Sequence, residues 1–563
     1  MFPFQPSKGF HFHAVTLTLL WVCAFSPSLA AQTWVPTATQ GLAGLLANAT
    51  QTGPLPAATT LHIAVALRLN HQASLVHYVQ TINDPSSPLF GSSLTVSEFV
   101  ASYAPTSAEV ESVVNYLTSQ GFSNIQVEPN NLFVTADGTA AAIGAAFFTS
   151  IVQFEQNNRI VYANLTAAQV PSSLGATVLA VLGLNNAGIM TTPIQTQAAS
   201  SVTLPSVHFY PPQGFWQAYD VGTTPAGSQT KIAIFTEGNL TQVIADLRFA
   251  EGVNGLPQVP VEVVQVGLAS PDTSGQDEWD LDTQMSTGMA RNVAKLILYT
   301  TTSLSDSDVA LMFNKFAHQN IAKAGNASFG LCETFAFLDG SMVADDQVFL
   351  EAAAQGQTVF TSTGDNGSAC PVVGVTNGVP LSGAAGMVEY PASSPYVVAV
   401  GGTTLTTDAN FNYIAEVGWD AGGGGISAWE GSPFWQQPVL PTTAAGKAIP
   451  DVSMDADIVS GALVYIGCQP GEAPGNCQFI VGGTSLASPL WLGTWARLQS
   501  AHSNKLGFAP LRLYRLYQTP PATYPGFHDI VGGCNGFFCA IPGFDYVTGL
   551  GTPDVTKLNA AVQ

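Results

Sequence analysis

The sequence predicts an α/β fold, in which a parallel sheet carries helices on both faces, preceded by a smaller α+β unit. From about residue 209 onward, short apolar strands alternate with helical segments. Strands that alternate with helices are typical of a parallel sheet covered on both sides. No internal repeat and no glycine-rich nucleotide-binding loop interrupts the pattern. The predicted strands are 232–235, 261–266, 296–300, 359–361 and 397–400.

Residues 32–186 form the predicted α+β unit. A helix should begin after Thr95, because Thr95 and Glu98 have the spacing of a capping box. An amphipathic helix is expected over 109–120, where a glycine follows and ends it. Two strands, 125–127 and 132–134, should flank a turn at an Asn-Asn pair.

The composition indicates an acidic protein that does not bind nucleic acid. The 563 residues include 15 Lys and Arg against 37 Asp and Glu, a formal net charge of −22. Nucleic-acid binding needs Lys and Arg to meet the phosphates, so that class is excluded. A chain poor in cations also has few salt bridges to lose in acid, where its carboxylates would be neutralised.

Residues 1–31 have the pattern of a secretory signal peptide. Lys8 precedes an apolar stretch, 14–25, and small residues at 28–31 offer a cleavage site. The stretch is short for a membrane span, and no later run is long enough. We therefore expect a secreted protein with no membrane span after signal removal, with a retained anchor as the alternative.

Six cysteines remain once the signal, with Cys23, is removed. An even number in an exported chain permits disulfides, although six cysteines allow about 15 connectivities. No CxxC and no nearby histidine pairing points to a metal site on them. Proximity along the chain favours Cys468 with Cys477 and Cys534 with Cys539, which leaves Cys332 for Cys370.

Residues 187–206 differ from both neighbouring parts. They are rich in Thr, Ser, Ala, Gln and Pro and carry no charge. Such a composition predicts an exposed linker, the kind of segment that proteases cut most readily. We expect a processing site here, followed by a second domain over 207–563.

The sharpest chemical signal is the segment Gly483-Thr484-Ser485, which lies between an apolar strand, 479–481, and an apolar helix. A serine at a helix N-terminus exposes its hydroxyl, and the free backbone N–H groups and helix dipole help to hold a developing oxyanion. The alternative is an ordinary helix cap, for which Ser and Thr are the usual residues.

A nucleophilic serine needs a base, and no histidine lies in a catalytic motif. Glu278 and Asp282, four residues apart, should share one face of a helix. Two close carboxyls titrate as a coupled pair with one raised apparent pKa, so Glu278 can act as the base towards Ser485 while Asp282 orients it. A solvated acidic face is the alternative. The histidines considered are His208, His318, His502 and His528.

A third carboxyl group, that of Asp365, follows the strand at 359–361 in a glycine-bounded turn. A turn at the C-terminal end of a parallel strand points into the usual active-site crevice of an α/β sheet. A protonated Asp365 can donate a hydrogen bond to an oxyanion. The alternative is an aspartate that only forms the turn.

Together these segments resemble the sedolisin family, the serine-carboxyl peptidases, in order and spacing. The resemblance implies that Glu278 is the base, Asp282 its partner, Asp365 the oxyanion residue and Ser485 the nucleophile. It implies a subtilisin-like peptidase domain, with 328–330 and 423–427 lining the substrate cleft, and a ferredoxin-like activation propeptide of the pro-kumamolisin kind over about 60–185.

The resemblance also implies one structural calcium ion near the C-terminus. Asp529 and Asp545 would supply side-chain oxygens, and Ile530, Ile541 and Gly543 backbone carbonyls, a donor set that suits calcium. Ile541 stands where the family usually has glycine, and the loop between the two aspartates is short. A calcium-free, glycine-rich loop is the alternative.

The implied activity is peptide-bond hydrolysis through an acyl-enzyme, by a secreted, acid-acting endopeptidase made as a self-processing precursor. Its partners would be protein or peptide substrates and its own propeptide as an intramolecular inhibitor, in a monomer. Acid is expected to release the propeptide by protonating interface carboxylates. The alternatives are a tripeptidyl exopeptidase of the same family, a conventional subtilisin-like protease, and a non-catalytic secreted binding scaffold.

Overall fold

The computed structural model describes residues 32–562 apart from short gaps. The chain divides into two compact units, 1–33 and 34–563, and every feature below belongs to the second. The predicted signal peptide and the 199–206 end of the predicted linker lie outside the described residues. The gaps are 43–45, 47–48, 157, 193, 199–207, 371–374, 377–378, 381–386, 442–443 and 518–524.

An antiparallel sheet in the order β4-β5-β3-β9 forms the centre of the N-terminal part. With the helices α3 and α4 it gives the β-α-β-β-α-β order of a ferredoxin-like unit, as expected. The two predicted strands are β4 and β5. The bounds are β3 Thr60–Leu67, α3 Ser107–Ser119, β4 Ser123–Val127, β5 Phe133–Thr139, α4 Ala140–Ala146 and β9 Val178–Leu182.

Side chains that alternate along β3 explain how this sheet packs on both faces. Ile63 and Val65 are buried in the unit's own core, with α3 and α4. Ala64 and Ala66 point the other way and join the large core of the C-terminal part, where β3 contacts α8 (Asp306–Gln319). Small residues on that face let the sheet approach the helices closely.

Short helices and strands complete the N-terminal part. The capping box of Thr95 and Glu98 is confirmed at the start of α2. The helix expected from 109 begins two residues earlier, because Thr106 and Glu109 form a second capping box. The remaining bounds are β1 Trp34–Pro36, β2 Thr50–Pro54, α1 Gln72–Ile82, α2 Val96–Ser102, β6 Ile151–Gln156, β7 Arg159–Asn164 and β8 Gln169–Pro171.

The C-terminal part is built on an eight-stranded sheet in the order β12-β13-β11-β14-β16-β20-β21, with β24 also beside β20. Every pairing is parallel except that of β20 with β21, which confirms the parallel sheet and its five predicted strands. The bounds are β11 Lys231–Glu237, β12 Val261–Gln265, β13 Lys295–Thr301, β14 Ala324–Ala327, β16 Thr358–Ser362, β20 Val398–Thr407, β21 Tyr413–Gly418 and β24 Val452–Asp455.

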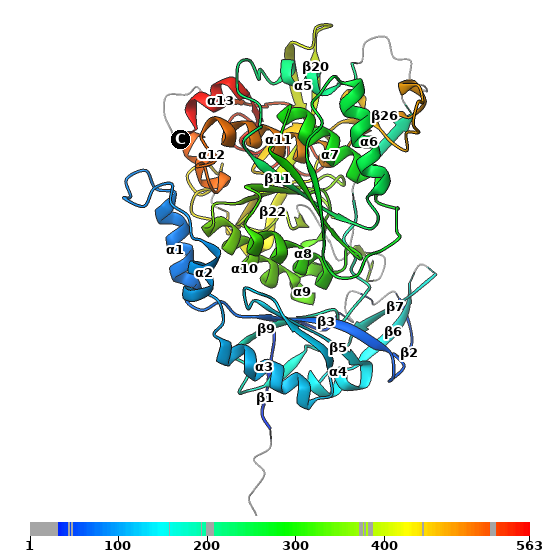
Figure 1. The fold of residues 1–563 in the computed structure, drawn as a ribbon. Helices are drawn as coiled ribbons and strands as arrows, with labels where there is room; N and C mark the ends of the chain where they lie inside the picture. The colour runs from blue at the N-terminus through cyan, green and yellow to red at the C-terminus, as the bar shows by residue number, and fades with distance from the viewer. Residues whose placement is uncertain are drawn as a thin grey trace, which may run out of the picture. The chain divides into compact units, whose positions relative to one another are not determined.

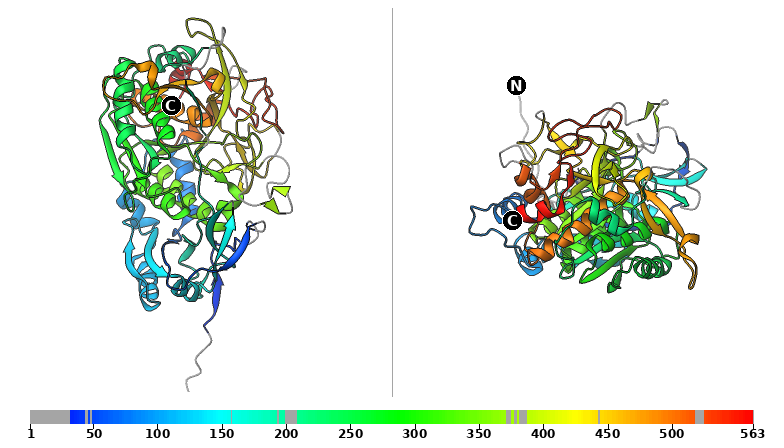
Figure 2. Two further views of the ribbon diagram at one scale, coloured as in Figure 1. Left: turned by 90° about the vertical axis from the view of Figure 1, so that its right-hand side faces the viewer. Right: turned by 90° about the horizontal axis from the view of Figure 1, so that it is seen from above.

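Helices cover both faces of this sheet (Figure 1). The buried helix α11 packs on β14, β16, β20 and β24, while α8 contacts β13 and β11 and α10 contacts β16. In Figures 1 and 2 the orange α11 lies beside the green α7, although the two are far apart in the sequence. The helix bounds are α5 Pro212–Ala218, α6 Thr241–Val253, α7 Gln276–Ala290, α9 Glu333–Asp339, α10 Ser341–Ala354, α11 Thr484–Ala501, α12 Ala509–Tyr517 and α13 Val555–Ala561.

The predicted strand at 479–481 is β26 (Gln478–Gly482), and it belongs to a separate antiparallel sheet with β10 (Gln195–Ala198) and β25 (Ala462–Tyr465). The three disulfides favoured by the spacing are present: Cys332–Cys370, Cys468–Cys477 and Cys534–Cys539. No helix among the described residues is both long and apolar enough to cross a membrane.

Candidate active site

Two buried helices, α7 and α11, bring three of the predicted residues together. Helix α7 carries Glu278 and Asp282, and α11 begins one residue before Ser485. Gly493 of α11 lies against α7, where a Cβ atom would stand 2.5 Å from the carbonyl oxygen of Ser286. Only glycine permits so close an approach, so Gly493 sets the separation of the two helices and of their functional groups.

Glu278, Asp282 and Ser485 are all buried, with exposed fractions of 1%, 0% and 0%. The Ser485 hydroxyl lies near enough to Glu278 to lower the pKa of its carboxyl group. Neither group has a hydrogen-bond partner within 3.5 Å among the described residues. Unpartnered buried polar groups are uncommon, and catalytic hydrogen bonds often close only when substrate binds.

Burial and mutual repulsion govern the two carboxyl groups on α7. Burial raises the pKa of Glu278 well above its usual value, and the negative charges of Asp282, Asp365 and Asp277 raise it further. Burial likewise raises the pKa of Asp282, while hydrogen bonding from Ser328 and Asn326 opposes the shift. Two buried acids one helical turn apart therefore favour sharing a proton over ionising together.

Asp365 lies in a turn directly after β16, next to the start of α11. Gly364 has φ 92°, a conformation that favours glycine, and lets the chain turn back. The backbone N–H and the hydroxyl of Thr484 donate to Asp365 Oδ1 at 2.8 and 2.9 Å, while Oδ2 is buried with no partner in the part of the chain that the structure describes. Burial raises the pKa of Asp365 to about 7, against the lowering by Thr484. In acid the free Oδ2 carries a proton that Asp365 can donate.

The segments expected to line the cleft meet at this turn. The backbone N–H of Gly423 donates to the carbonyl oxygen of Gly364 at 2.8 Å. A Cβ atom on Gly364 would lie 2.5 Å from the carboxyl carbon of Glu389, and one on Gly330 would lie 2.9 Å from its Oε2. The structure thus places Gly423 at the turn that holds Asp365, and Gly330 on the other side of Glu389 from that turn.

Glu389 is a buried carboxyl that the sequence interpretation missed. Burial, followed by the negative charge of Asp365, raises its pKa to about 8. The signal available in the sequence was a single acid between Val388 and Tyr390 in a charge-free apolar stretch. Its position between Gly330 and Gly364 places it at the cleft, beside the proposed oxyanion residue.

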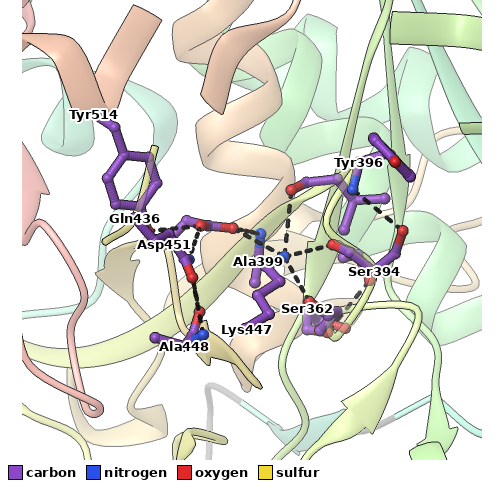
Figure 3. A network of polar contacts seen from close by, with 12 residues as sticks. Ser362, Ser394, Tyr396, Ala399, Gln436, Lys447, Ala448, Asp451 and Tyr514 are labelled. Carbon is purple, nitrogen blue, oxygen red and sulfur yellow. Dashed lines mark hydrogen bonds and ion pairs between the residues drawn. The ribbon is translucent and has the colours of Figure 1, made fainter. Parts of the chain in front are cut away.

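A buried lysine braces the chain that follows Glu389 (Figure 3). Lys447 Nζ donates to the carbonyl oxygens of Ala392 and Ser394 at 2.9 and 2.7 Å. It also pairs with Asp451 at 3.3 Å, and Asp451 accepts from the backbone N–H of Ala399 at 2.8 Å. These bonds tie the loop between Glu389 and β20 to the sheet, and so hold one wall of the site.

The first half of the predicted linker is less exposed than its composition indicated. Met190 is 3% exposed, and the backbones of Thr191 and Gly330 exchange two hydrogen bonds of 2.9 and 3.0 Å. Further on, β10 pairs antiparallel with β26, the strand that leads into Ser485. Segments with no charge can still add a strand to a sheet edge, which composition alone does not reveal.

Buried acids also lie where the N-terminal part covers the C-terminal part. Asn130 Nδ2 donates to Glu351 Oε2 at 2.8 Å, and the backbone N–H of Gly183 donates to Asp306 Oδ2 at 3.0 Å. Burial raises the pKa of Glu351 to about 8 and that of Asp306 to about 6.

These two shifts bear on how acid affects the interface. Burial raises both pKa values, while the hydrogen bonds that Asn130 and Gly183 of the N-terminal part donate to these carboxyl groups lower them. The two contributions have opposite signs, so they do not fix how the N-terminal part changes proton binding at Glu351 and Asp306. The expectation that acid releases the propeptide by protonating interface carboxylates stays a prediction.

The residues of the implied calcium site converge on one short segment. Both carboxylate oxygens of Asp529 accept from the backbone N–H of Gly543 at 3.1 Å, and Asp545 Oδ2 accepts from that of Ile541 at 3.1 Å. No ion pair among the described residues neutralises either aspartate. The described residues contain no group of three His, Cys, Asp or Glu side chains that could hold a metal ion. A cation at this loop would therefore need backbone carbonyl oxygens as further ligands, such as that of Ile530. Two carboxylates that form no ion pair are the kind of donors that suit calcium.

Comparison with known proteins agrees with this geometry. The pro-kumamolisin activation domain matches residues 47–187, and the subtilase family matches 269–519. Tripeptidyl-peptidase 1 of Canis lupus familiaris is 26% identical over 88% of this chain and 91% of its own length.

Two bacterial relatives are more similar. Sedolisin of Pseudomonas sp. (strain 101) is 38% identical over 98% of this chain and 96% of its own length. Xanthomonalisin of Xanthomonas sp. (strain T-22) is 35% identical over 94% of this chain and 71% of its own length. A solved structure of Pseudomonas sedolisin, a serine-carboxyl proteinase complexed with two molecules of pseudo-iodotyrostatin, matches with a TM-score of 0.58 and 38% identity, covering 63% of this chain and 98% of that one. The chain therefore belongs to the sedolisin family.

Proposed function

We propose that this chain is the precursor of a secreted, monomeric, acid-acting serine-carboxyl endopeptidase that hydrolyses peptide bonds through an acyl-enzyme. The observation that carries the proposal is the buried pair Glu278 and Asp282 beside the unpartnered hydroxyl of Ser485. A carboxyl pair with raised pKa values supplies a base without a histidine.

In this proposal Ser485 Oγ attacks the peptide carbonyl carbon, and its proton passes to Glu278, which Asp282 orients. Asp365 donates a hydrogen bond to the oxyanion of the tetrahedral intermediate. Glu278 then protonates the leaving amine as the C–N bond breaks. A water molecule then attacks the resulting ester and gives a proton to Glu278. Glu278 returns this proton to Ser485 Oγ as the ester C–O bond breaks, which releases the acid product and regenerates the serine and the base.

Residues 32–186 act as the intramolecular inhibitor, and processing cuts within 187–206. The pairing of β10 with β26 supports this proposal. It places part of the linker alongside the strand that leads into Ser485. After the linker is cleaved, acid would release the N-terminal part by protonating interface carboxylates. N-terminal sequencing of the mature form tests the boundary, and a start far outside 187–206 would refute it.

A single calcium ion would be held by Asp529, Asp545 and the carbonyl oxygens of Ile530, Ile541 and Gly543. When bound, the ion would neutralise the two carboxylates and fasten the C-terminal loop. It has no step in the hydrolysis.

Cleavage of peptides with blocked amino termini tests the endopeptidase assignment. Internal cleavage of a blocked peptide by the processed enzyme is expected, and its loss in Ser485→Ala ties the cleavage to this site. Release of tripeptides from free amino termini, with blocked peptides left intact, would instead assign the tripeptidyl mode.

A further inference from the structure

A chain of four buried polar side chains runs from Asp282 to the helix that carries Ser485. Ser488 Oγ donates to Asn326 Oδ1 at 2.6 Å, Asn326 Nδ2 donates to Ser328 Oγ at 2.9 Å, and Ser328 Oγ donates to Asp282 Oδ1 at 2.7 Å. All four residues have an exposed fraction of 0%. Ser488 lies three residues after Ser485 on α11, so the chain of bonds joins the nucleophile's helix to the carboxyl pair on α7.

The direction of each bond in this chain is set by its neighbours. Because Asn326 Nδ2 occupies an acceptor position of Ser328, the single hydroxyl proton of Ser328 is directed at Asp282. If the Asn326 amide were turned over, Ser328 would donate to Asn326 instead of to Asp282 Oδ1, and the Asn326 amide N–H groups, which also lower the pKa of Asp282, would turn away from it. The Ser488 hydroxyl, which donates to Asn326 Oδ1, holds the amide in the productive orientation.

The bond to Oδ1 also determines which oxygen of Asp282 can carry a proton. Oδ1 accepts from Ser328, whereas Oδ2 is buried with no partner among the described residues. A proton on Asp282 therefore resides on Oδ2, the oxygen left free for exchange with the neighbouring Glu278. The other charged groups that act on this pair are Asp277 and Asp365, both acidic.

We propose that Ser328 is a positioning residue for catalysis, whose hydroxyl holds Asp282 so that the shared proton lies on Oδ2 and the singly ionised carboxyl pair is stabilised. Asn326 fixes the donor direction of Ser328 and also lowers the pKa of Asp282 directly, while Ser488 holds the Asn326 amide in place. The inference rests on the proposed function, since it assigns a role within the same carboxyl pair.

The expected effect of removing the hydroxyl has a definite sign. A hydrogen bond to Asp282 favours its ionised form and so lowers its pKa. Without that bond the doubly protonated pair, which has no free base, persists to higher pH. The acid limb of kcat/KM should therefore move upward by about one pH unit, the size expected for loss of one hydrogen bond to a charged group.

The test is the pH profile of blocked-peptide cleavage by the processed enzyme, compared between wild type, Ser328→Ala, Ser328→Thr and Ser488→Ala. We expect Ser328→Ala to move the acid limb upward and lower kcat, Ser328→Thr to restore the wild-type limb, and Ser488→Ala to move it in the same direction by less. If Ser328→Ala fails to fold, the position of the acid limb of Ser488→Ala tests the inference instead.

An acid limb that stays in place while activity falls equally at every pH would overturn the inference, because a purely structural role predicts that pattern. Failure of the proposed function looks different, since wild type would then be inactive at every pH or Ser485→Ala would retain activity.

Discussion

Replacement of Glu351 by glutamine should stabilise the precursor at neutral pH and leave it unchanged in acid. Glu351 has an exposed fraction of 0% and accepts from Asn130 Nδ2 at 2.8 Å and from Gln355 Nε2 at 2.9 Å. Burial raises its pKa from 4.5 to about 8. A carboxyl with a raised folded-state pKa contributes its full stability below the unfolded pKa and loses it as pH rises towards the folded pKa.

The magnitude follows from that window. At pH 7 the buried carboxyl must stay protonated about 2.5 pH units above its unfolded pKa, which lowers the free energy of unfolding by about 3 kcal/mol at about 1.4 kcal/mol per unit. At pH 4 both states hold the proton and the loss vanishes. Glutamine has the same shape and no charge. Once the Gln355 amide turns over, the new amide can donate to Gln355 Oε1, which has no partner among the described residues.

Thermal unfolding of the precursor at pH 4 and pH 7 measures this effect, in a Ser485→Ala background that prevents self-cleavage. Glu351→Gln should raise the midpoint at pH 7 only, and the exposed Glu111→Gln should do so at neither pH. A lower midpoint at pH 7 for Glu351→Gln would show that the ionised carboxylate stabilises the interface, and would refute the reasoning.

Three further predictions concern the site and the C-terminal loop. Gly493→Ala places a Cβ atom 2.5 Å from the Ser286 carbonyl oxygen, so α7 and α11 should move apart. The resulting displacement of Glu278 from Ser485 should lower kcat by on the order of 100-fold. An unchanged kcat would contradict the role of that contact. Asp365→Asn keeps a hydrogen-bond donor that cannot ionise. Because burial raises the pKa of Asp365 to about 7, activity should fall less steeply above pH 7 in this variant than in wild type. An alkaline limb identical to that of wild type would show that another group causes the fall in activity. Chelation with EGTA should lower the unfolding midpoint of the processed enzyme but not of Asp545→Asn, and equal sensitivity of the two would argue against the assigned ligands.

The sequence predicted much of the site because its signals are local. A spacing of four between Glu278 and Asp282 places both on one helical face, and a Gly-Thr-Ser segment between a strand and a helix places Ser485 at a helix start. Capping boxes and buried apolar strands likewise depend on neighbouring residues.

Features that depend on distant contacts could not be predicted in this way. The four residues of β14 are Ala, Gly, Asn and Ala, which show no strand preference, yet β14 lies at the centre of the sheet because Gly325 leaves room for the Phe235 ring. The bond between Ser328 and Asp282 joins segments far apart in the sequence. The burial of Met190 depends on a surface that the linker itself does not encode.

Peptide cleavage from pH 3 to 8 by the purified precursor, beside Ser485→Ala and Glu278→Gln, tests the central claim most directly. A serine nucleophile activated by a carboxyl pair predicts acid-triggered self-cleavage and an acidic optimum in wild type, with both lost in each variant. An optimum above pH 7, self-processing by Ser485→Ala, or a folded wild-type protein with no activity at any pH would contradict it.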